Sequence, residues 1–213
     1  MDLLSEKIEA YALEHTQEEP ELLQQLNRET WQKITVPRML SGHFQGRVLS
    51  MISKLIQPKT ILEIGTYTGY SALCLAEGMK KNGVLHTIDH NEELVDIQKK
   101  YFAKSDFNKN IRQHLGNALD IIPRINESFD LVFIDADKSN YINYFNALIN
   151  KMNRGGVILS DNVLWSGKVL KPVNSEDTDT ITLIEYNKML KNDARIETIL
   201  IPIRDGLSLS RVK

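Results

Sequence analysis

Two short apolar runs of this chain each end in side chains that carry oxygen. Asp135 follows the run 131–134, and Asp161 and Asn162 follow the run that begins at Ile158. Runs of this kind predict buried parallel strands, and the carboxyl ends of such strands meet at one edge of a sheet. We therefore expect Asp135, Asp161 and Asn162 to lie together. Two carboxylates and an amide oxygen suit a hard divalent cation such as Mg²⁺.

Lys138 stands three residues after Asp135, near the predicted start of the next helix. A bound cation disfavours the charged form of a nearby ammonium group, so we predict that Lys138 accepts a proton. The alternative for Lys138 is a solvated place on the helix surface. The alternative for Asp135 and Asp161 is the capping of helices that follow the two strands.

The segment 63–71 lies where the first predicted strand turns into a helix. Gly65 and Gly69 allow the backbone to turn sharply and to approach a bound molecule, although two glycines are as typical of a structural turn. Asp89 ends the second predicted strand, from where an acidic side chain accepts hydrogen bonds from ribose hydroxyls. Glu63 is also acidic and the loop carries no Lys or Arg. The site therefore favours a cationic or neutral nucleoside, such as S-adenosylmethionine, over phosphates.

The elements that must position these residues alternate from residue 60 onward. Apolar runs predict strands at 60–64, 84–89, 111–115, 130–134, from 158, 196–203 and 207–212, and periodic segments predict helices at 70–80, 92–104, 118–125, 139–152 and 178–191. This alternation predicts an α/β fold with a doubly wound, mostly parallel sheet. The last two strands flank Arg204-Asp205-Gly206, which predicts an antiparallel hairpin at the sheet edge. The long loop after Asn162 is expected to be functional or mobile.

Three amphipathic helices are predicted before the sheet, at 2–15, 21–33 and 42–56. We interpret residues 1–58 as a helical cap and residues 59–213 as the core of a single domain. A chain of 213 residues and 24.4 kDa is of ordinary size for one α/β domain.

The composition excludes several classes of protein. A net charge of −2 and a pI of about 6.2 provide no strong field for nucleic acid or a membrane surface. The single cysteine, Cys74, stands among apolar residues, so we predict a packing role and a reducing compartment. The N-terminus is charged and has no apolar run typical of a signal peptide or a membrane span. We expect a cytoplasmic protein.

Four segments in order resemble a bacterial member of the metal-dependent class I O-methyltransferases of the caffeoyl-CoA and catechol type. They are Leu62–Ser71, Phe133–Lys138, Asp161–Gly167 and Asp205–Leu207. The resemblance spans about 39–211 and implies a seven-stranded Rossmann-like sheet, S-adenosylmethionine as methyl donor, and a homodimer. It also implies a divalent cation, Mg²⁺ with Mn²⁺ or Ca²⁺ as alternatives, held by Asp135, Asp161 and Asn162.

The resemblance also implies which residues bind the donor. They are Ser41, Glu63, Gly65, Thr66, Tyr67, Ser71, Asp89, Ala118 and Asp135. Asp135 is implied to touch both the cation and the substrate, and with Lys138 it forms the expected catalytic pair. Ser166 and Ser139 depart from the plant members of the family, which have a substrate-binding Asn and an acidic residue at these positions.

The expected reaction is methyl transfer to one hydroxyl of a vicinal dihydroxy aromatic compound of the catechol or caffeoyl kind. A free phenol has a pKa of about 10, and coordination to a metal ion makes a hydroxyl more acidic. Methylation of a hydroxyuridine in tRNA is an alternative, and the mild acidity of the chain argues weakly against it. A catalytically silent binding module is another. A dehydrogenase lacks support because the glycine pattern has no pyrophosphate loop.

Overall fold

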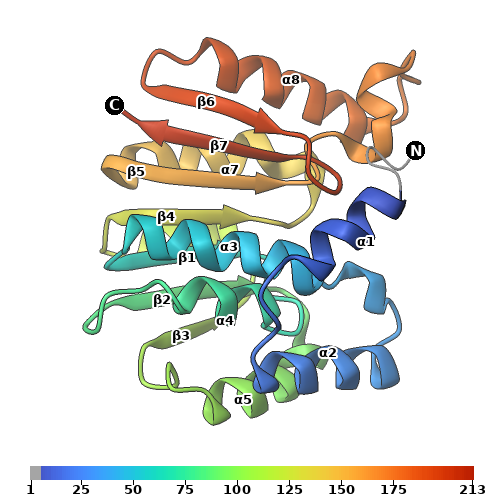
Figure 1. Cartoon of the computed structure of the whole chain (residues 1–213). Coiled ribbons are helices and arrows are strands. Elements are labelled where there is room, and N and C mark those ends of the chain that lie inside the picture. The colour runs from blue at the N-terminus through green and yellow to red at the C-terminus, as the bar shows by residue number, and fades with distance from the viewer. Residues whose placement is uncertain (1–5) are drawn as a thin grey trace.

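The computed structural model describes residues 6–213, and its centre is one seven-stranded sheet (Figure 1). The strands are β1 (Thr60–Ile64), β2 (Val84–Asp89), β3 (Ile111–Leu115), β4 (Phe129–Ile134), β5 (Met152–Asp161), β6 (Ile196–Ile201) and β7 (Leu207–Val212). They lie in the order β3-β2-β1-β4-β5-β7-β6. Strands β1 to β5 run parallel, and β7 runs antiparallel to β5 and β6. The predicted mostly parallel sheet with an antiparallel hairpin at its edge is confirmed.

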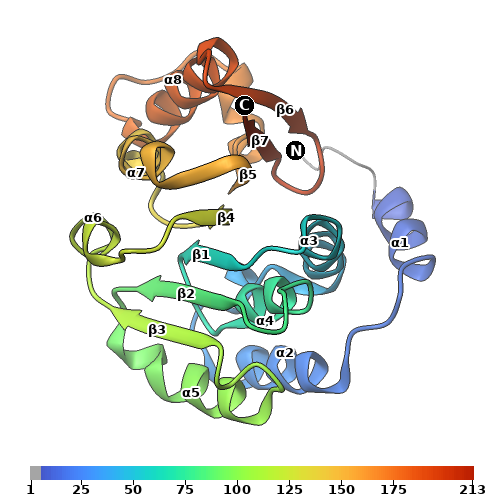
Figure 2. The same cartoon turned by 90° about the vertical axis from the view of Figure 1, so that its left-hand side faces the viewer.

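Helices cover both faces of the sheet (Figure 2). They are α1 (Glu6–Glu14), α2 (Glu21–Lys33), α3 (Gly42–Ile56), α4 (Tyr70–Ala76), α5 (Val95–Lys104), α6 (Ala118–Ile121), α7 (Tyr141–Leu148) and α8 (Thr178–Asn192). Short 3-10 helices are η1 (Pro37–Met39), η2 (Glu92–Leu94), η3 (Ile122–Arg124), η4 (Lys138–Asn140), η5 (Ile149–Lys151) and η6 (Trp165–Leu170). One apolar core includes α2 to α5, and the other includes α6 to α8.

Several predicted element boundaries were wrong. The predicted helix at 70–80 ends at Ala76, and β5 already begins at Met152 instead of Ile158. At the start of β5, Met152 pairs with Phe129 of β4, and the register then shifts before the next pair. An apolar pattern does not reveal such a backbone pairing. Strand β6 ends at Ile201 because Pro202 has no N–H to donate to the ladder. Residues 2–5 of the first predicted helix lie outside the described residues.

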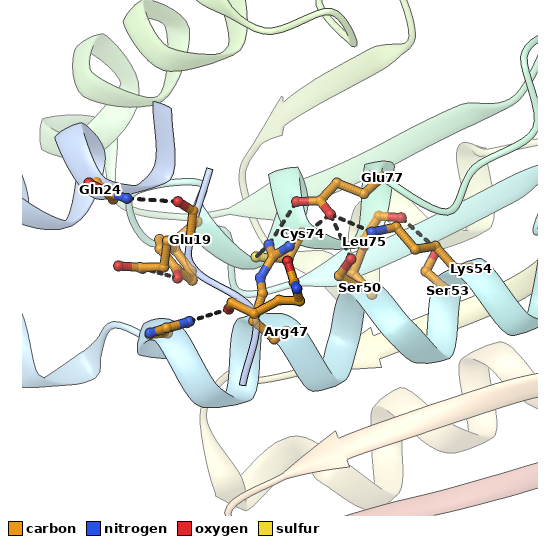
Figure 3. Close-up of polar contacts among 12 residues, drawn as sticks. Glu19, Gln24, Arg47, Ser50, Ser53, Lys54, Cys74, Leu75 and Glu77 are labelled. Carbon is orange, nitrogen blue, oxygen red and sulfur yellow. Dashed lines mark hydrogen bonds and ion pairs between the residues drawn. The ribbon is translucent and has the colours of Figure 1, made fainter. Parts of the chain in front are cut away.

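A charged network ties α3 to α4, and we call it the α3–α4 network (Figure 3). It consists of Arg47, Ser50, Lys54 and Glu77. The Arg47 guanidinium donates to both oxygens of Glu77 at 2.7 and 2.9 Å, and Ser50 and Lys54 donate to the same carboxylate at 2.7 and 2.9 Å. Cys74 is buried beside Arg47, which confirms its predicted packing role.

The N-terminal helices pack onto the sheet layer. Leu23 and Leu26 of α2 are buried in the core that α4 and α5 share, while Trp31 on the same helix is exposed. Along residues 6–213, the helices are too short or too polar to cross a membrane.

Candidate functional site

Strand register brings the predicted ligands level with one another. Ile134 of β4 pairs with Ser160 of β5, so the residues that follow, Asp135 and Asp161, stand side by side where the two strands end. Ile64 of β1 pairs with Ile134 from the other side. The site therefore lies beyond the carboxyl ends of β1, β4 and β5, which run parallel. The arrowheads of β4 and β5 point the same way in Figure 1.

Three carboxyl side chains project from these strands toward α3 and α4. Glu63, Asp135 and Asp161 each follow a core residue of that face by two positions, and side chains alternate along a strand. The core residues are Ile61, Phe133 and Leu159. We call Glu63, Asp135 and Asp161 the carboxyl row.

The protein places little positive charge beside the carboxyl row. Burial raises the pKa of Glu63 to about 8, with a further contribution from Asp135, against a hydrogen bond from Thr87. Burial and the nearby Asp135 likewise raise the pKa of Asp161 to about 6. Within residues 6–213, Lys138 is the one cation at ion-pair distance from the row, 3.2 Å from Asp135. The row is thus suited to bind cationic groups.

One oxygen of Glu63 is unpaired. Its Oε2 accepts a hydrogen bond from Thr87 at 2.5 Å, while Oε1 is buried and has no partner among residues 6–213. A buried acceptor without a partner is unfavourable, because it has lost water and gained nothing in return. A ligand with an ammonium group would satisfy this oxygen, so Glu63 fits the predicted donor.

The loop between β1 and α4 presses against Asp135. Gly65 has φ +98°, and a Cβ there would lie 1.8 Å from the Asp135 carbonyl oxygen, so only glycine fits. Asp89, at the end of β2, accepts hydrogen bonds from the backbone N–H of Tyr67 at 2.7 Å and of Asn91 at 2.9 Å. Asp89 therefore shapes the loop, and its carboxylate keeps further acceptor sites for a ligand.

The remaining predicted donor residues lie in three places. Thr66 lies in the same loop, with its hydroxyl 2.5 Å from that of Thr87, and Ser71 is buried in the first turn of α4. Ala118 is buried at the start of α6, which follows β3. Ser41 immediately precedes α3, on the side where Asp161 lies.

Lys138 is buried, so the alternative of a solvated lysine is wrong. Its side-chain nitrogen lies 3.2 Å from Asp135 Oδ1 and donates to the Tyr141 hydroxyl at 2.8 Å. The Tyr141 hydroxyl donates in turn to the Asp161 carbonyl oxygen at 2.9 Å. Tyr141 therefore fixes the Lys138 nitrogen beside the carboxyl row.

Both oxygens of the Asp161 carboxylate already accept one hydrogen bond. Oδ1 accepts from the Asn162 N–H at 2.8 Å, and Oδ2 accepts from the Gln45 side chain at 2.6 Å. Neither partner lies in a helix that follows the strand, and Asp137 rather than Asp135 precedes η4, so the capping alternative is wrong. Among residues 6–213 no three His, Cys, Asp or Glu side chains gather to hold a metal ion. A cation here would need Asn162 as its third ligand.

The sequence patterns missed two residues of this site. Gln45 is 2% exposed on α3, and Tyr141 is fully buried at the start of α7. The available signals were a polar side chain on an otherwise apolar helix face and a tyrosine one helical turn after Lys138.

Trp165 lies close to Lys138. The Lys138 nitrogen is 5.9 Å from the centre of the Trp165 ring, and the Lys168 nitrogen is 5.7 Å from it. Trp165 and Ser166 both adopt left-handed backbone conformations, with φ of +48° and +52°. Such conformations are uncommon outside glycine and often mark functional loops.

Comparison with known proteins gives consistent matches over most of the chain. The profile of the family described as O-methyltransferase matches residues 13–213. Caffeoyl-CoA O-methyltransferase of Petroselinum crispum is 36% identical over 222 aligned positions, which cover 98% of this chain and 92% of that protein. Caffeoyl-CoA O-methyltransferase 5 of Nicotiana tabacum is 34% identical with the same coverage.

Solved structures agree with these matches. PaMTH1 of Podospora anserina, a methyltransferase with SAH bound, superposes with a TM-score of 0.90 at 26% identity and covers 98% of this chain and 95% of its own. TomG of Streptomyces achromogenes, an O-methyltransferase of tomaymycin synthesis in complex with SAM, gives a TM-score of 0.88 at 27% identity, with coverage of 97% and 96%.

Proposed function

The chain belongs to the O-methyltransferase family and is a methyltransferase enzyme, and from this premise we propose its donor, its acceptor and its cation. The donor is S-adenosylmethionine, and the acceptor is one hydroxyl of a vicinal dihydroxy aromatic compound. A divalent cation, Mg²⁺ with Mn²⁺ or Ca²⁺ as alternatives, is held by Asp135, Asp161 and Asn162. The observation that carries this proposal is the gathering of three carboxyl groups at one sheet edge, with Lys138 as their one cationic partner among residues 6–213.

On the donor side, the unpaired Oε1 of Glu63 accepts from the ammonium group of the donor, and Asp89 accepts from its ribose hydroxyls. The sulfonium and ammonium charges of the donor complement a site that is rich in carboxyl groups. The proposed donor residues are Ser41, Glu63, Gly65, Thr66, Tyr67, Ser71, Asp89, Ala118 and Asp135.

On the cation side, Asp135 and Asp161 offer carboxylate oxygens at one level of neighbouring strands, and Asn162 offers an amide oxygen. Hard divalent cations prefer such oxygen ligands. When bound, the ion makes a coordinated hydroxyl of the acceptor more acidic. A bound cation would also offset the repulsion between the carboxylates of Asp135 and Asp161.

Lys138 is the proposed proton acceptor. In its neutral form its nitrogen takes the proton of the acceptor hydroxyl, and the resulting oxygen attacks the methyl carbon of the donor. The bond from that carbon to sulfur breaks, and S-adenosylhomocysteine leaves. Tyr141 and Asp135 hold the Lys138 nitrogen in place, which supplies the orientation that the reaction needs.

We propose that the acceptor is a small aromatic compound. The plant relatives, in contrast, are named after caffeoyl-CoA, which is a thioester. The resemblance implies that plant members have an Asn and an acidic residue where this chain has Ser166 and Ser139. The ring of Trp165, close to Lys138, offers a flat apolar surface to an aromatic acceptor. A hydroxyuridine of tRNA is the second candidate, and it is less suited to a chain with a pI of about 6.2.

The test is methyl transfer from labelled S-adenosylmethionine to catechol or to total tRNA, after metal removal and with Mg²⁺ restored. We expect methylated catechol only when Mg²⁺ is present. Equal activity after chelation would overturn the role of the cation. Label in tRNA but not in catechol would overturn the proposed acceptor.

We also propose a homodimer built from single-domain subunits, with residues 1–58 as a cap on the core at 59–213. Light scattering measures the mass of the particle, and limited proteolysis shows whether the cap and the core are cleaved apart. A particle of one chain, or a core that persists after loss of the cap, would contradict these two expectations.

A further inference from the structure

The turn between β6 and β7 contacts two segments near the carboxyl row, the start of α3 and the loop after β5. Arg204 donates hydrogen bonds from Nη1 to the Ser41 carbonyl oxygen and to the side-chain oxygen of Gln45. The carboxylate of the next residue, Asp205, accepts from the Ser166 N–H in the loop after β5. The Asp205-Gly206-Leu207 motif therefore belongs to a turn that reaches the site, although the proposed chemistry gives it no part.

The chemistry of its two partners fixes the orientation of the Gln45 amide. A guanidinium group only donates hydrogen bonds, and an ionised carboxylate only accepts them. The oxygen of Gln45 must therefore face Arg204, and its nitrogen must face Asp161, to whose Oδ2 it donates at 2.6 Å. Gln45 is 2% exposed, so water does not compete for these bonds.

We propose that Arg204 and Gln45 are positioning residues that hold the Asp161 carboxylate in the orientation that binds the cation. We call the series Arg204, Gln45, Asp161 the Arg204 relay. The inference rests on the proposed function, because it takes Asp161 as a ligand. Partners that hydrogen-bond to a metal ligand commonly fix its orientation and strengthen binding.

The relay leaves room for the cation on Asp161. Each carboxylate oxygen accepts at about two positions, and one position on each is taken, by Asn162 at Oδ1 and by Gln45 at Oδ2. A direct ion pair with Arg204 would occupy both oxygens in a bidentate manner. Because the Gln45 amide lies between Arg204 and Asp161, only one hydrogen bond reaches the carboxylate from this side. The other lone pairs of the Asp161 oxygens stay free.

The backbone at Arg204 supports a role for its side chain. Arg204 has φ +46°, a left-handed backbone conformation that residues other than Gly, Asn and Asp rarely adopt. Glycine would fit this backbone with less strain. Arg204→Gly therefore removes the relay's first member while suiting the turn, which separates the role of the side chain from the stability of the fold.

The test measures binding of Mn²⁺ alone to the metal-free full-length protein, with free Mn²⁺ followed by its paramagnetic resonance signal. Gln45→Met keeps the length of the side chain and removes both hydrogen bonds, and we expect it to weaken Mn²⁺ binding about tenfold or more. Arg204→Gly should weaken it about threefold. The double variant should bind no more weakly than Gln45→Met, since members of one series do not add.

A second measurement uses activity as a function of Mg²⁺ concentration. In Gln45→Met the half-saturating Mg²⁺ concentration should rise about tenfold, whereas kcat at saturating Mg²⁺ should stay close to that of the parent protein. Ser53→Ala is the matched control, because it removes another buried hydrogen bond of α3, to the Leu75 carbonyl oxygen at 2.6 Å. It should leave Mn²⁺ binding unchanged.

The outcomes distinguish the relay from the proposed function. Unchanged Mn²⁺ affinity in Gln45→Met, or in Arg204→Gly if the first variant does not fold, would overturn the relay. A double variant whose loss is the product of the two single losses would overturn its arrangement in series. If the parent protein and Asp161→Ala bind Mn²⁺ equally, the cation site itself fails, and the relay falls with it.

Discussion

The carboxyl row and the α3–α4 network place acidic groups on the same side of one sheet, but they balance charge in opposite ways. In the network, burial acts to raise the pKa of Glu77, but hydrogen bonds from Arg47, Ser50 and Lys54 lower it below its usual value. In the row, burial and the neighbouring Asp135 raise the pKa of Glu63 and of Asp161. Figure 3 shows the bonds that converge on Glu77.

The difference shows where the fold is stabilised and where it is prepared for a ligand. The network gives one carboxylate two cationic partners, so it is complete in the protein alone. Among residues 6–213, the row gives three carboxyl groups one cationic partner. The donor and the divalent ion of the proposed function would supply the missing positive charge. Titratable groups with strongly shifted pKa values near a sheet edge are typical of functional sites.

The largest effect is expected at Asp135, which the proposed function places at the donor, the cation and Lys138. Asp135→Ala should lower kcat/KM about 1000-fold or more. It removes a proposed ligand of the cation and, at the same time, the ion-pair partner of Lys138. Asp130→Asn at the other end of β4 is the matched control, since Asp130 accepts from the N–H groups of Lys59 and Thr60. Activity of Asp135→Ala within tenfold of the parent protein would contradict the account.

Replacement of Lys138 comes next. Lys138→Met should lower kcat about 100-fold or more, the usual contribution of a general base. Lys138→Arg should not restore activity, because a guanidinium group does not lose its proton at these pH values. Single-turnover rates measure the chemical step directly. Recovery in the arginine variant would show that Lys138 acts through its charge alone.

In the α3–α4 network the expected effect is on stability. Glu77→Gln should lower the free energy of unfolding by about 2 kcal/mol, because Arg47 keeps its charge and loses its partner in a partly buried place. The side chains of Arg47 and Glu77 are 11% and 16% exposed. Urea unfolding measures the change, and kcat/KM should stay close to that of the parent. Lower activity at unchanged stability would show that the network serves the reaction.

The last effect concerns Glu63, depends on pH, and has the opposite sign. With its pKa raised from 4.5 to about 8, the folded protein holds a proton that the unfolded chain has released, so stability falls as pH rises between these values. The amide side chain of the Glu63→Gln variant does not titrate. In the absence of donor, the free energy of unfolding of this variant should therefore rise relative to that of the parent protein, by roughly 1 kcal/mol per pH unit in this range.

Urea unfolding at pH 5.5 and pH 7.5 tests this difference, and calorimetry with S-adenosylmethionine tests the other half of the prediction. The variant should bind the donor more weakly, because an amide oxygen is a poorer partner for an ammonium group than a carboxylate. A parent protein that gains stability relative to Glu63→Gln as pH rises would contradict the raised pKa.

Most of the fold and part of the site could be predicted from the sequence. Strand periodicity and the alternation with helices predicted the parallel sheet, and the ends of two apolar runs predicted where Asp135 and Asp161 would meet. These features depend on residues close together in the chain. Gln45, Tyr141 and Arg204 could not be found in this way, because their roles depend on contacts between α3, α7 and the β6–β7 turn. No local pattern determines which polar side chain will face which.

The most direct test of the cation site is an anomalous difference map from crystals soaked in Mn²⁺. The account predicts one strong peak per chain, at about 2.0–2.6 Å from side-chain oxygens of Asp135, Asp161 and Asn162, as expected for oxygen-ligated divalent cations. A peak elsewhere, or none at the carboxyl row in saturating Mn²⁺, would contradict it.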